Sequence, residues 1–135
     1  MNNQLIKIKE KLSKYNTVYK RLDIVLDMVD SFDLNKKDIK FLVPEVKMFD
    51  DIVFKPHFHS MLPGMEDAVQ GVVEFDNGRY VSVVGGGSGL YGDGKTTFEI
   101  GHNDIEGNFD VIGWLTRSEI TDVMLRIQVM PPIED

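Results

Sequence analysis

The residues that most resemble a chemical site lie in a glycine-rich stretch between two strand-like runs. Gly89 to Thr96 match the phosphate-loop pattern G-x-x-x-x-G-K-[ST] in every specified position. A phosphate loop must lead into a helix whose first backbone amides face the phosphates. The run Thr96-Thr-Phe-Glu-Ile100 is instead β-branched and aromatic, and residues that break a helix follow it. We therefore predict a strand after the glycines and no phosphate cradle.

The same stretch is still the best candidate for a binding loop. Glycines allow positive φ and close backbone approach, and long loops carry function more often than regular elements do. Exposed backbone amides in such a loop can hold an anionic ligand or a partner. The candidate contact residues are Gly85, Gly86, Gly87, Ser88, Gly89, Tyr91, Gly92, Asp93, Gly94 and Lys95.

Three histidines are the only candidate metal ligands. His57 and His59 would share one face of an extended segment, and His102 could approach from another strand. No His-x-x-x-His spacing or linked carboxylate set reinforces them, so we predict no bound metal and no cofactor. The chain has no cysteine, which excludes disulfides and thiolate catalysis. Residues 86–90 lack the last glycine of a hydrolase nucleophile elbow. The residues thus favour a binding protein over an enzyme.

The N-terminal third predicts one long helix, residues 1–32, with a coiled-coil-like apolar stripe. Its members recur at alternating spacings of three and four. We call them the N-terminal stripe: Leu5, Ile8, Leu12, Tyr15, Tyr19, Leu22, Leu26 and Val29. Asn16 and Thr17 are poor helix formers, but the stripe keeps its phase through them.

The charges of this segment predict a partner copy. Residues 1–21 hold six basic side chains and one acid, whereas residues 22–33 hold four aspartates and no basic residue. A lone helix prefers the opposite order, because its dipole favours acids at the N-terminus and bases at the C-terminus. An antiparallel homodimer through the N-terminal stripe would set the basic end against the acidic end. The alternative is an amphipathic helix folded back on its own sheet.

The rest of the chain predicts an α+β fold with an antiparallel meander of four to five strands. A short helix should span residues 33–42, with Asp33 or Asn35 as its N-cap. Extended segments are expected at 51–59, 70–75, 79–84, 96–100 and 109–114, with Asn77-Gly78 as a tight hairpin and a turn at 105–108. Thr116 and Glu119 form a capping box at the start of a short C-terminal helix.

Length and composition favour one domain over residues 1–135, with the long helix beside an α+β body at 48–135 in two layers.

Residues 1–48 carry 10 basic and 7 acidic side chains, and residues 49–135 carry 5 basic and 15 acidic side chains. The acidic second part should repel nucleic acid. The apolar runs are too short for a membrane span, and no signal-peptide core is visible, so we expect a cytoplasmic protein.

The second half resembles small, uncharacterised proteins of tailed phages and prophages. The resemblance covers roughly residues 70–128 and rests on five short runs. They are Phe75-Asp-Asn-Gly78, Ser82-Val-Val84, Leu90-Tyr-Gly-Asp-Gly94, Phe98-Glu-Ile100 and Asp110-Val-Ile-Gly-Trp-Leu-Thr116 through Glu119. It implies a phage-encoded protein of the host cytoplasm and carries no activity with it.

Two functions remain as hypotheses. The first is a non-enzymatic accessory protein that binds a host protein, with inhibition of that protein as one form, because an acidic surface can occupy a basic site. The second is a small-ligand or nucleotide-binding protein that sequesters its ligand with the loop Gly85–Gly94.

Overall fold

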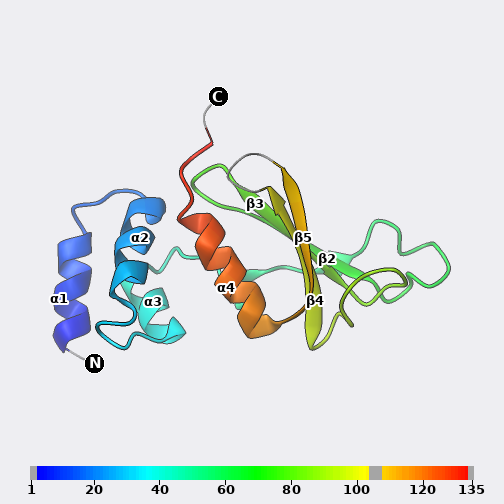
Figure 1. Ribbon diagram of the computed structural model, residues 1–135, viewed down its shortest axis with the longest axis horizontal. Helices are drawn as coiled ribbons and strands as arrows, with labels where there is room; N and C mark the ends of the chain where they lie inside the picture. The colour runs from blue at the N-terminus through cyan, green and yellow to red at the C-terminus, as the bar shows by residue number, and fades with distance from the viewer. Residues whose placement is uncertain (1–2, 104–107, 134–135) are drawn as a thin grey trace.

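A five-stranded antiparallel sheet and four helices make up the computed structural model, which describes residues 3–103 and 108–133 (Figure 1). The sheet order is β1-β2-β3-β4-β5, so every strand lies beside its neighbour in sequence. The helices are α1 (Asn3–Leu12), α2 (Val18–Met28), α3 (Lys36–Leu42) and α4 (Arg117–Gln128), with a 3-10 turn η1 (Phe49–Asp51). The strands are β1 (Lys55–Pro56), β2 (Val69–Glu74), β3 (Tyr80–Gly85), β4 (Thr97–Asn103) and β5 (Phe109–Thr116). The α+β class and the meander are confirmed.

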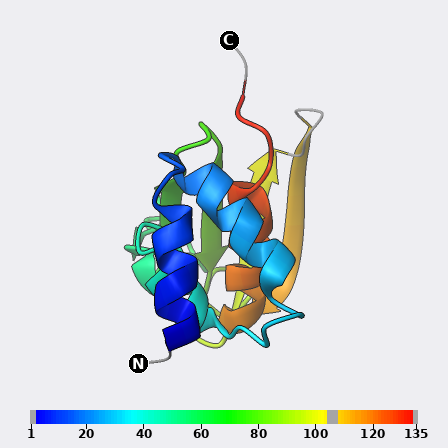
Figure 2. The same cartoon turned by 90° about the vertical axis from the view of Figure 1, so that its left-hand side faces the viewer.

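The predicted long N-terminal helix is wrong, because the chain breaks it into α1 and α2. The break lies at Ser13 to Thr17, where the Ser13 amide bonds to the Glu10 carbonyl and the Thr17 hydroxyl accepts the Lys20 amide as an N-cap. The phase of the apolar stripe survives the break, which is why the sequence pattern does not reveal it. The two helices form an antiparallel hairpin (Figures 1 and 2).

The N-terminal stripe is used inside the chain. Ile8, Leu12 and Leu22 are buried in a core that α1, α2 and α3 share, and the core reaches Leu125 of α4. Tyr15 and Tyr19 are only half-buried. The hairpin also brings the basic α1 beside the acidic α2 within one chain, so the charge order requires no partner copy. The antiparallel dimer through this stripe stays an untested prediction, and the fold of the single chain accounts for the stripe and for the charge order without it.

The sheet is covered on one face by α4. Alternate residues of the strands, with η1 and α4, form a second core that includes Val81, Val83, Phe98, Ile100 and Met124. Helix α4 lies between the sheet and the three N-terminal helices, so the layers follow one another along the long axis (Figure 1). The structure therefore has an additional helical layer beyond the predicted two.

The predicted caps and the hairpin are confirmed. Thr116 and Glu119 form the capping box at the start of α4, with bonds of 3.0 and 3.2 Å. Asn35 is the N-cap of α3, and Gly78 takes a φ of 79° in the turn between β2 and β3. The strand predicted at 51–59 is mostly wrong, since β1 holds only two residues. The turn predicted at 105–108 lies almost entirely outside the described residues.

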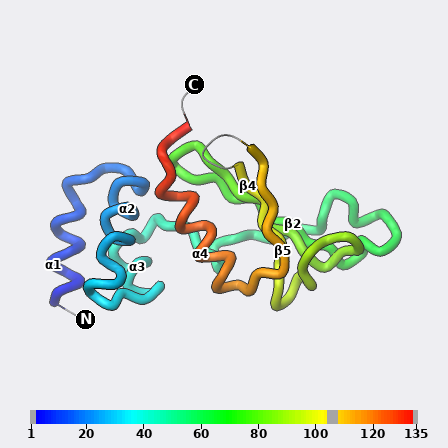
Figure 3. Tube along the Cα trace, viewed as in Figure 1, coloured from blue at the N-terminus to red at the C-terminus, as the bar shows by residue number. Residues whose placement is uncertain are grey.

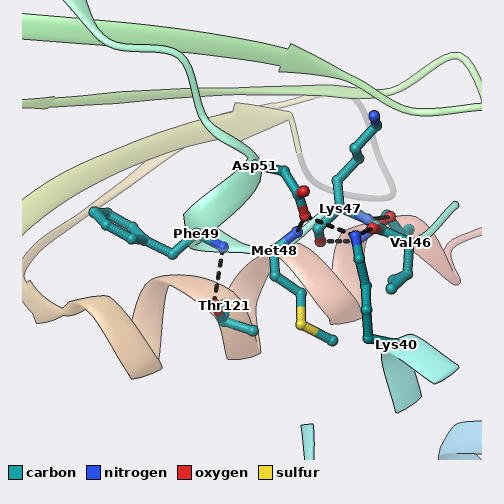
Figure 4. Close-up of polar contacts among 8 residues, drawn as sticks. Lys40, Val46, Lys47, Met48, Phe49, Asp51 and Thr121 are labelled. Atoms are coloured by element: carbon teal, nitrogen blue, oxygen red, sulfur yellow. Dashed lines mark hydrogen bonds and ion pairs between the residues drawn. The ribbon is translucent and has the colours of Figure 1, made fainter. Parts of the chain in front are cut away.

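The segment between α3 and the sheet is fixed by polar contacts. The Lys40 ammonium lies 3.0 Å from the Asp51 carboxylate, which also accepts the Met48 amide at 2.9 Å (Figure 4). The Phe49 amide donates to the buried Thr121 hydroxyl of α4 at 3.0 Å (Figure 4). These bonds satisfy backbone groups that leave regular structure, as buried polar groups require.

Two buried side-chain amides hold the far end of α4. Gln128 exchanges two bonds with the backbone of Lys47, each of 2.8 Å. Asn77, in the β2–β3 turn, donates to the carbonyls of Ile127 and Met130 at 2.8 and 3.1 Å. The Asn77 side chain acts as a C-terminal cap supplied from a distant turn, because the last carbonyls of a helix lack partners of their own.

No helix in the described part of the chain has the length and apolarity to cross a bilayer.

Candidate functional site

Two long loops meet at the end of the molecule opposite α1. The first loop, residues 57–68, joins β1 to β2, and the second, residues 86–96, joins β3 to β4. The trace shows both extending from the same end of the sheet (Figures 1 and 3). We call these loops the two-loop tip. It contains most of the glycine-rich candidate residues.

The two loops are bound to each other. The Ser88 amide donates to the Gly64 carbonyl at 2.7 Å. A Cβ atom at Gly87 would lie 2.6 Å from the Met65 sulfur and 2.9 Å from the Ala68 side chain, so the loops approach too closely for a larger residue. This contact and the bond make the tip one unit.

The glycine-rich loop also folds back on the strands. Gly92 lies against the backbone of Phe98, where a Cβ would come within 2.6 Å. The Tyr91 carbonyl accepts the Trp114 amide of β5 at 2.7 Å, and Gly113 leaves room for the Tyr91 side chain. The glycine-rich connection is therefore a packed loop in which glycines allow close approach.

Asp93 organises the part of the loop that matches the phosphate pattern. Its Oδ1 accepts the backbone amides of Lys95, Thr96 and Thr97 at 2.7–2.9 Å, and its Oδ2 accepts the Thr96 hydroxyl at 2.7 Å. These bonds hold the pKa of Asp93 well below its usual range, because they stabilise the carboxylate form. The amides that would face a phosphate are thus taken by a carboxylate. Residues 97–103 are strand β4, as predicted.

The pKa of Asp93 gives a pH test of this arrangement. Compared with Asp93→Asn, the wild type should gain stability that is constant above about pH 5 and shrinks as the pH falls below it. The sign follows because a pKa depressed in the folded state makes the unfolded chain bind more protons in that window. Urea unfolding of both proteins at several pH values between about 2.5 and 7 measures the difference. A difference that does not change with pH would contradict the role of the carboxylate.

The tip and its margin expose an unusual set of large apolar side chains. Met61 is 94% exposed, and Trp114 is 63% exposed. Trp114 also has a φ of 56°, in the left-handed region that non-glycine residues rarely occupy and that costs about 1–3 kcal/mol. The indole pairs with Tyr91 at 6.4 Å between ring centroids. The full set is Phe58, Met61, Leu62, Tyr91 and Trp114.

The three histidines do not converge. His57 is buried, and its Nδ1 accepts the His59 amide at 3.1 Å. Burial, and then the neighbouring His59, lowers the pKa of His57. His102 lies on β4, where its Nδ1 is 3.1 Å from the Asn103 carbonyl. Within the described ranges, no cluster of three or more histidine or carboxylate side chains is placed to hold a metal ion.

The sequence analysis missed the most exposed residues of the tip. The sequence predicts extended segments at 51–59, which holds Phe58, and at 109–114, which holds Trp114, and its pattern does not single out Met61 or Leu62. A signal was available, because Met61 and Leu62 are large apolar residues immediately before Pro63-Gly64, where a turn is expected. Such residues in a turn cannot enter a core easily.

Comparison with models of protein families, with curated proteins and with solved structures gives no match for this chain. The function must therefore be inferred from the geometry of the two-loop tip itself.

Proposed function

We propose that this chain works by binding another protein through the two-loop tip. The observation that carries the proposal is the exposure of Met61, Leu62 and Phe58 on a loop that is fixed by its neighbour. Aromatic residues and methionine are enriched at the centres of protein interfaces, and a few such anchors supply most of the binding energy. A contiguous exposed apolar patch on a small protein marks such a surface.

The rigidity of the tip supports this function. A loop that is already ordered loses less conformational freedom on binding, so more of the contact energy appears as affinity. The bond from Ser88 to Gly64 and the Asp93 turn provide this order before any partner arrives. The strained backbone at Trp114 also supports a binding role for this residue. Unfavourable backbone conformations persist mainly where they place a functional side chain.

The charge of the tip indicates the chemistry of the partner. Glu66, Asp67 and Asp93 are exposed on the two loops, and Lys95 is the one basic residue there. A matching surface would offer an apolar pocket with basic residues at its rim, since complementary charge speeds association and selects the partner. This agrees with the hypothesis of an acidic accessory protein that occupies a basic site on a host protein. The phage origin rests on the resemblance of residues 70–128 alone.

No feature of the loop favours the nucleotide-binding alternative, because the Asp93 carboxylate binds the backbone amides that an anion would need.

The proposal of protein binding predicts a partner whose binding depends on the exposed apolar side chains of the tip. In affinity capture from native-cell lysate, Met61→Asp/Leu62→Asp should lower recovery of the partner at least about tenfold, which corresponds to about 1.4 kcal/mol. Trp114→Gly should also lower recovery, and it removes the indole at a φ that glycine accepts freely.

The matched control is Val53→Asp, because Val53 is 72% exposed but lies before β1, outside the tip. This variant should capture as much partner as the wild type. Recovery should fall as salt is raised, since charge contributes to the contact. If the tip variants, with unchanged melting temperatures, still captured the same protein at full yield, the proposal would be wrong.

A further inference from the structure

The second edge of the sheet lacks two of the residue types that normally protect an edge strand, lysine and proline, although its register shifts between Ile112 and Leu115. The first edge, β1, is two residues long and consists of a lysine and a proline, both of which discourage pairing with another chain. The other edge, β5, has eight residues and contains neither lysine nor proline. Among the described residues no strand pairs with its outer side. The regular part of this edge, residues 109–112, is a template for strand addition.

Exposed apolar side chains lie beside this edge on both faces of the sheet. Phe109 and Val111 are exposed on the face opposite α4. On the other face, a hollow of about 240 Å³ lies between β5 and α4. Its lining is apolar at the base and charged at the rim: Ile112, Leu115, Val123, Glu119, Asp122 and Arg126. The hollow between β5 and α4 therefore has room for apolar side chains of one more strand.

The backbone at the centre of β5 is available for that strand. The Val111 amide donates to the carboxylate of its own neighbour Asp110 at 3.0 Å. In an antiparallel ladder the amides of alternate residues point to opposite sides, and we infer from the bond to Asp110 that this amide faces the open edge. The exposed Asp110 side chain can leave it at little cost when a better partner arrives.

We propose that β5 pairs antiparallel with β5 of a second copy of this chain, with the two-fold axis near Ile112. The pairing would join the two sheets into one of ten strands and place Ile112 of each copy over the hollow of the other. It is isologous, so every contact occurs twice. This interface lies outside the N-terminal stripe and does not depend on the protein-binding role of the tip.

The charges of α4 are self-complementary in this arrangement. Helix α4 runs back alongside β5 (Figure 2). With rises of about 3.3 Å per strand residue and about 1.5 Å per helix residue, α4 reaches the level of Ile112 near Leu125. Two antiparallel copies of α4 related at that level set Arg126 of each copy toward Asp122 of the other. Arg126 has no ion pair within the described part of one chain, whereas Asp122 pairs with Lys36 at 3.1 Å and is exposed enough to accept a second cation.

The experiment is sedimentation equilibrium of the full chain over a hundredfold range of concentration. The wild type should be a dimer that dissociates on dilution and more readily in high salt. Val111→Pro should raise the dissociation constant at least about tenfold, because proline removes the amide that is proposed to bond to the second copy. Val111→Lys should do the same through two lysines close to the two-fold axis, and Arg126→Glu should weaken the dimer by bringing like charges together.

The matched control is Val72→Lys, which makes the same change on the same face of the sheet but on β2. It should dimerise like the wild type. Melting curves establish that each variant is folded, and Val111→Lys serves if Val111→Pro is not. A wild type that is monomeric at every concentration would overturn the proposal. So would folded Val111 variants that dimerise as tightly as the wild type.

Discussion

Replacing Asn77 with aspartate should lower the free energy of unfolding by about 3 kcal/mol, the largest loss we expect from a single isosteric change. The Asn77 side chain is 2% exposed, and its Nδ2 donates to the Ile127 and Met130 carbonyls. Aspartate places an oxygen against these two oxygens, so both carbonyls lose their donor, and the buried charge keeps the Arg79 amide as its donor but gains no counter-charge. Urea unfolding at neutral pH measures the effect.

The control for this prediction is Asn16→Asp, the same chemical change at an exposed position in the α1–α2 connection. It should change the free energy of unfolding by less than about 0.5 kcal/mol. Because the Asn77 bonds hold the end of α4, the Asn77→Asp protein should also lose protection from hydrogen exchange at the last turn of that helix. A loss below about 1 kcal/mol would contradict the capping role of Asn77.

Replacing Gly113 with valine should destabilise the protein by about 2–3 kcal/mol and displace the glycine-rich loop. A Cβ at Gly113 would lie 2.4 Å from the Tyr91 Cβ and 3.2 Å from the Tyr91 carbonyl. Since that carbonyl accepts the Trp114 amide, the new side chain must push away the contact that joins the loop to β5. Tryptophan fluorescence reports the displacement, because Trp114 is the one tryptophan in the chain.

Gly89→Asn provides the control on the same loop. Gly89 has a φ of 84°, which asparagine tolerates, and a Cβ there would have no atom within 4 Å. The free energy of unfolding should change by less than about 1 kcal/mol, with the fluorescence of Trp114 unchanged. Equal losses at Gly89 and Gly113 would show that the loop is not packed against β5 as described.

The sheet and α4 could be predicted from sequence because their signals are local. Asn77-Gly78 between two β-rich runs and the capping box at Thr116 and Glu119 each depend on a few adjacent residues, and both are present. The α1–α2 break could not be found by the same reasoning. The stripe from Leu5 to Val29 keeps helical phase across five connecting residues, so only the tertiary packing of α1 with α3 distinguishes a hairpin from one helix.

The candidate site was predicted in part. The glycine-rich loop was singled out, and its lack of a following helix was inferred correctly from the β-branched Thr96 and Thr97. Its partner loop was not recognised, because the bond from Ser88 to Gly64 joins residues that no local pattern connects. The left-handed backbone of Trp114 is likewise a product of the packing of β5 against Tyr91, which spacing and composition do not encode.

Site-specific photo-crosslinking tests the central claim, protein binding by the two-loop tip, most directly. A photoreactive amino acid at position 61 should crosslink the chain to one defined protein in native-cell lysate, and the same probe at position 53 should not. Both native side chains are exposed, by 94% and 72%, so accessibility does not separate them. The yield at position 61 should fall with Trp114→Gly in the same chain. Equal crosslinking from both positions, or none from position 61, would contradict the account.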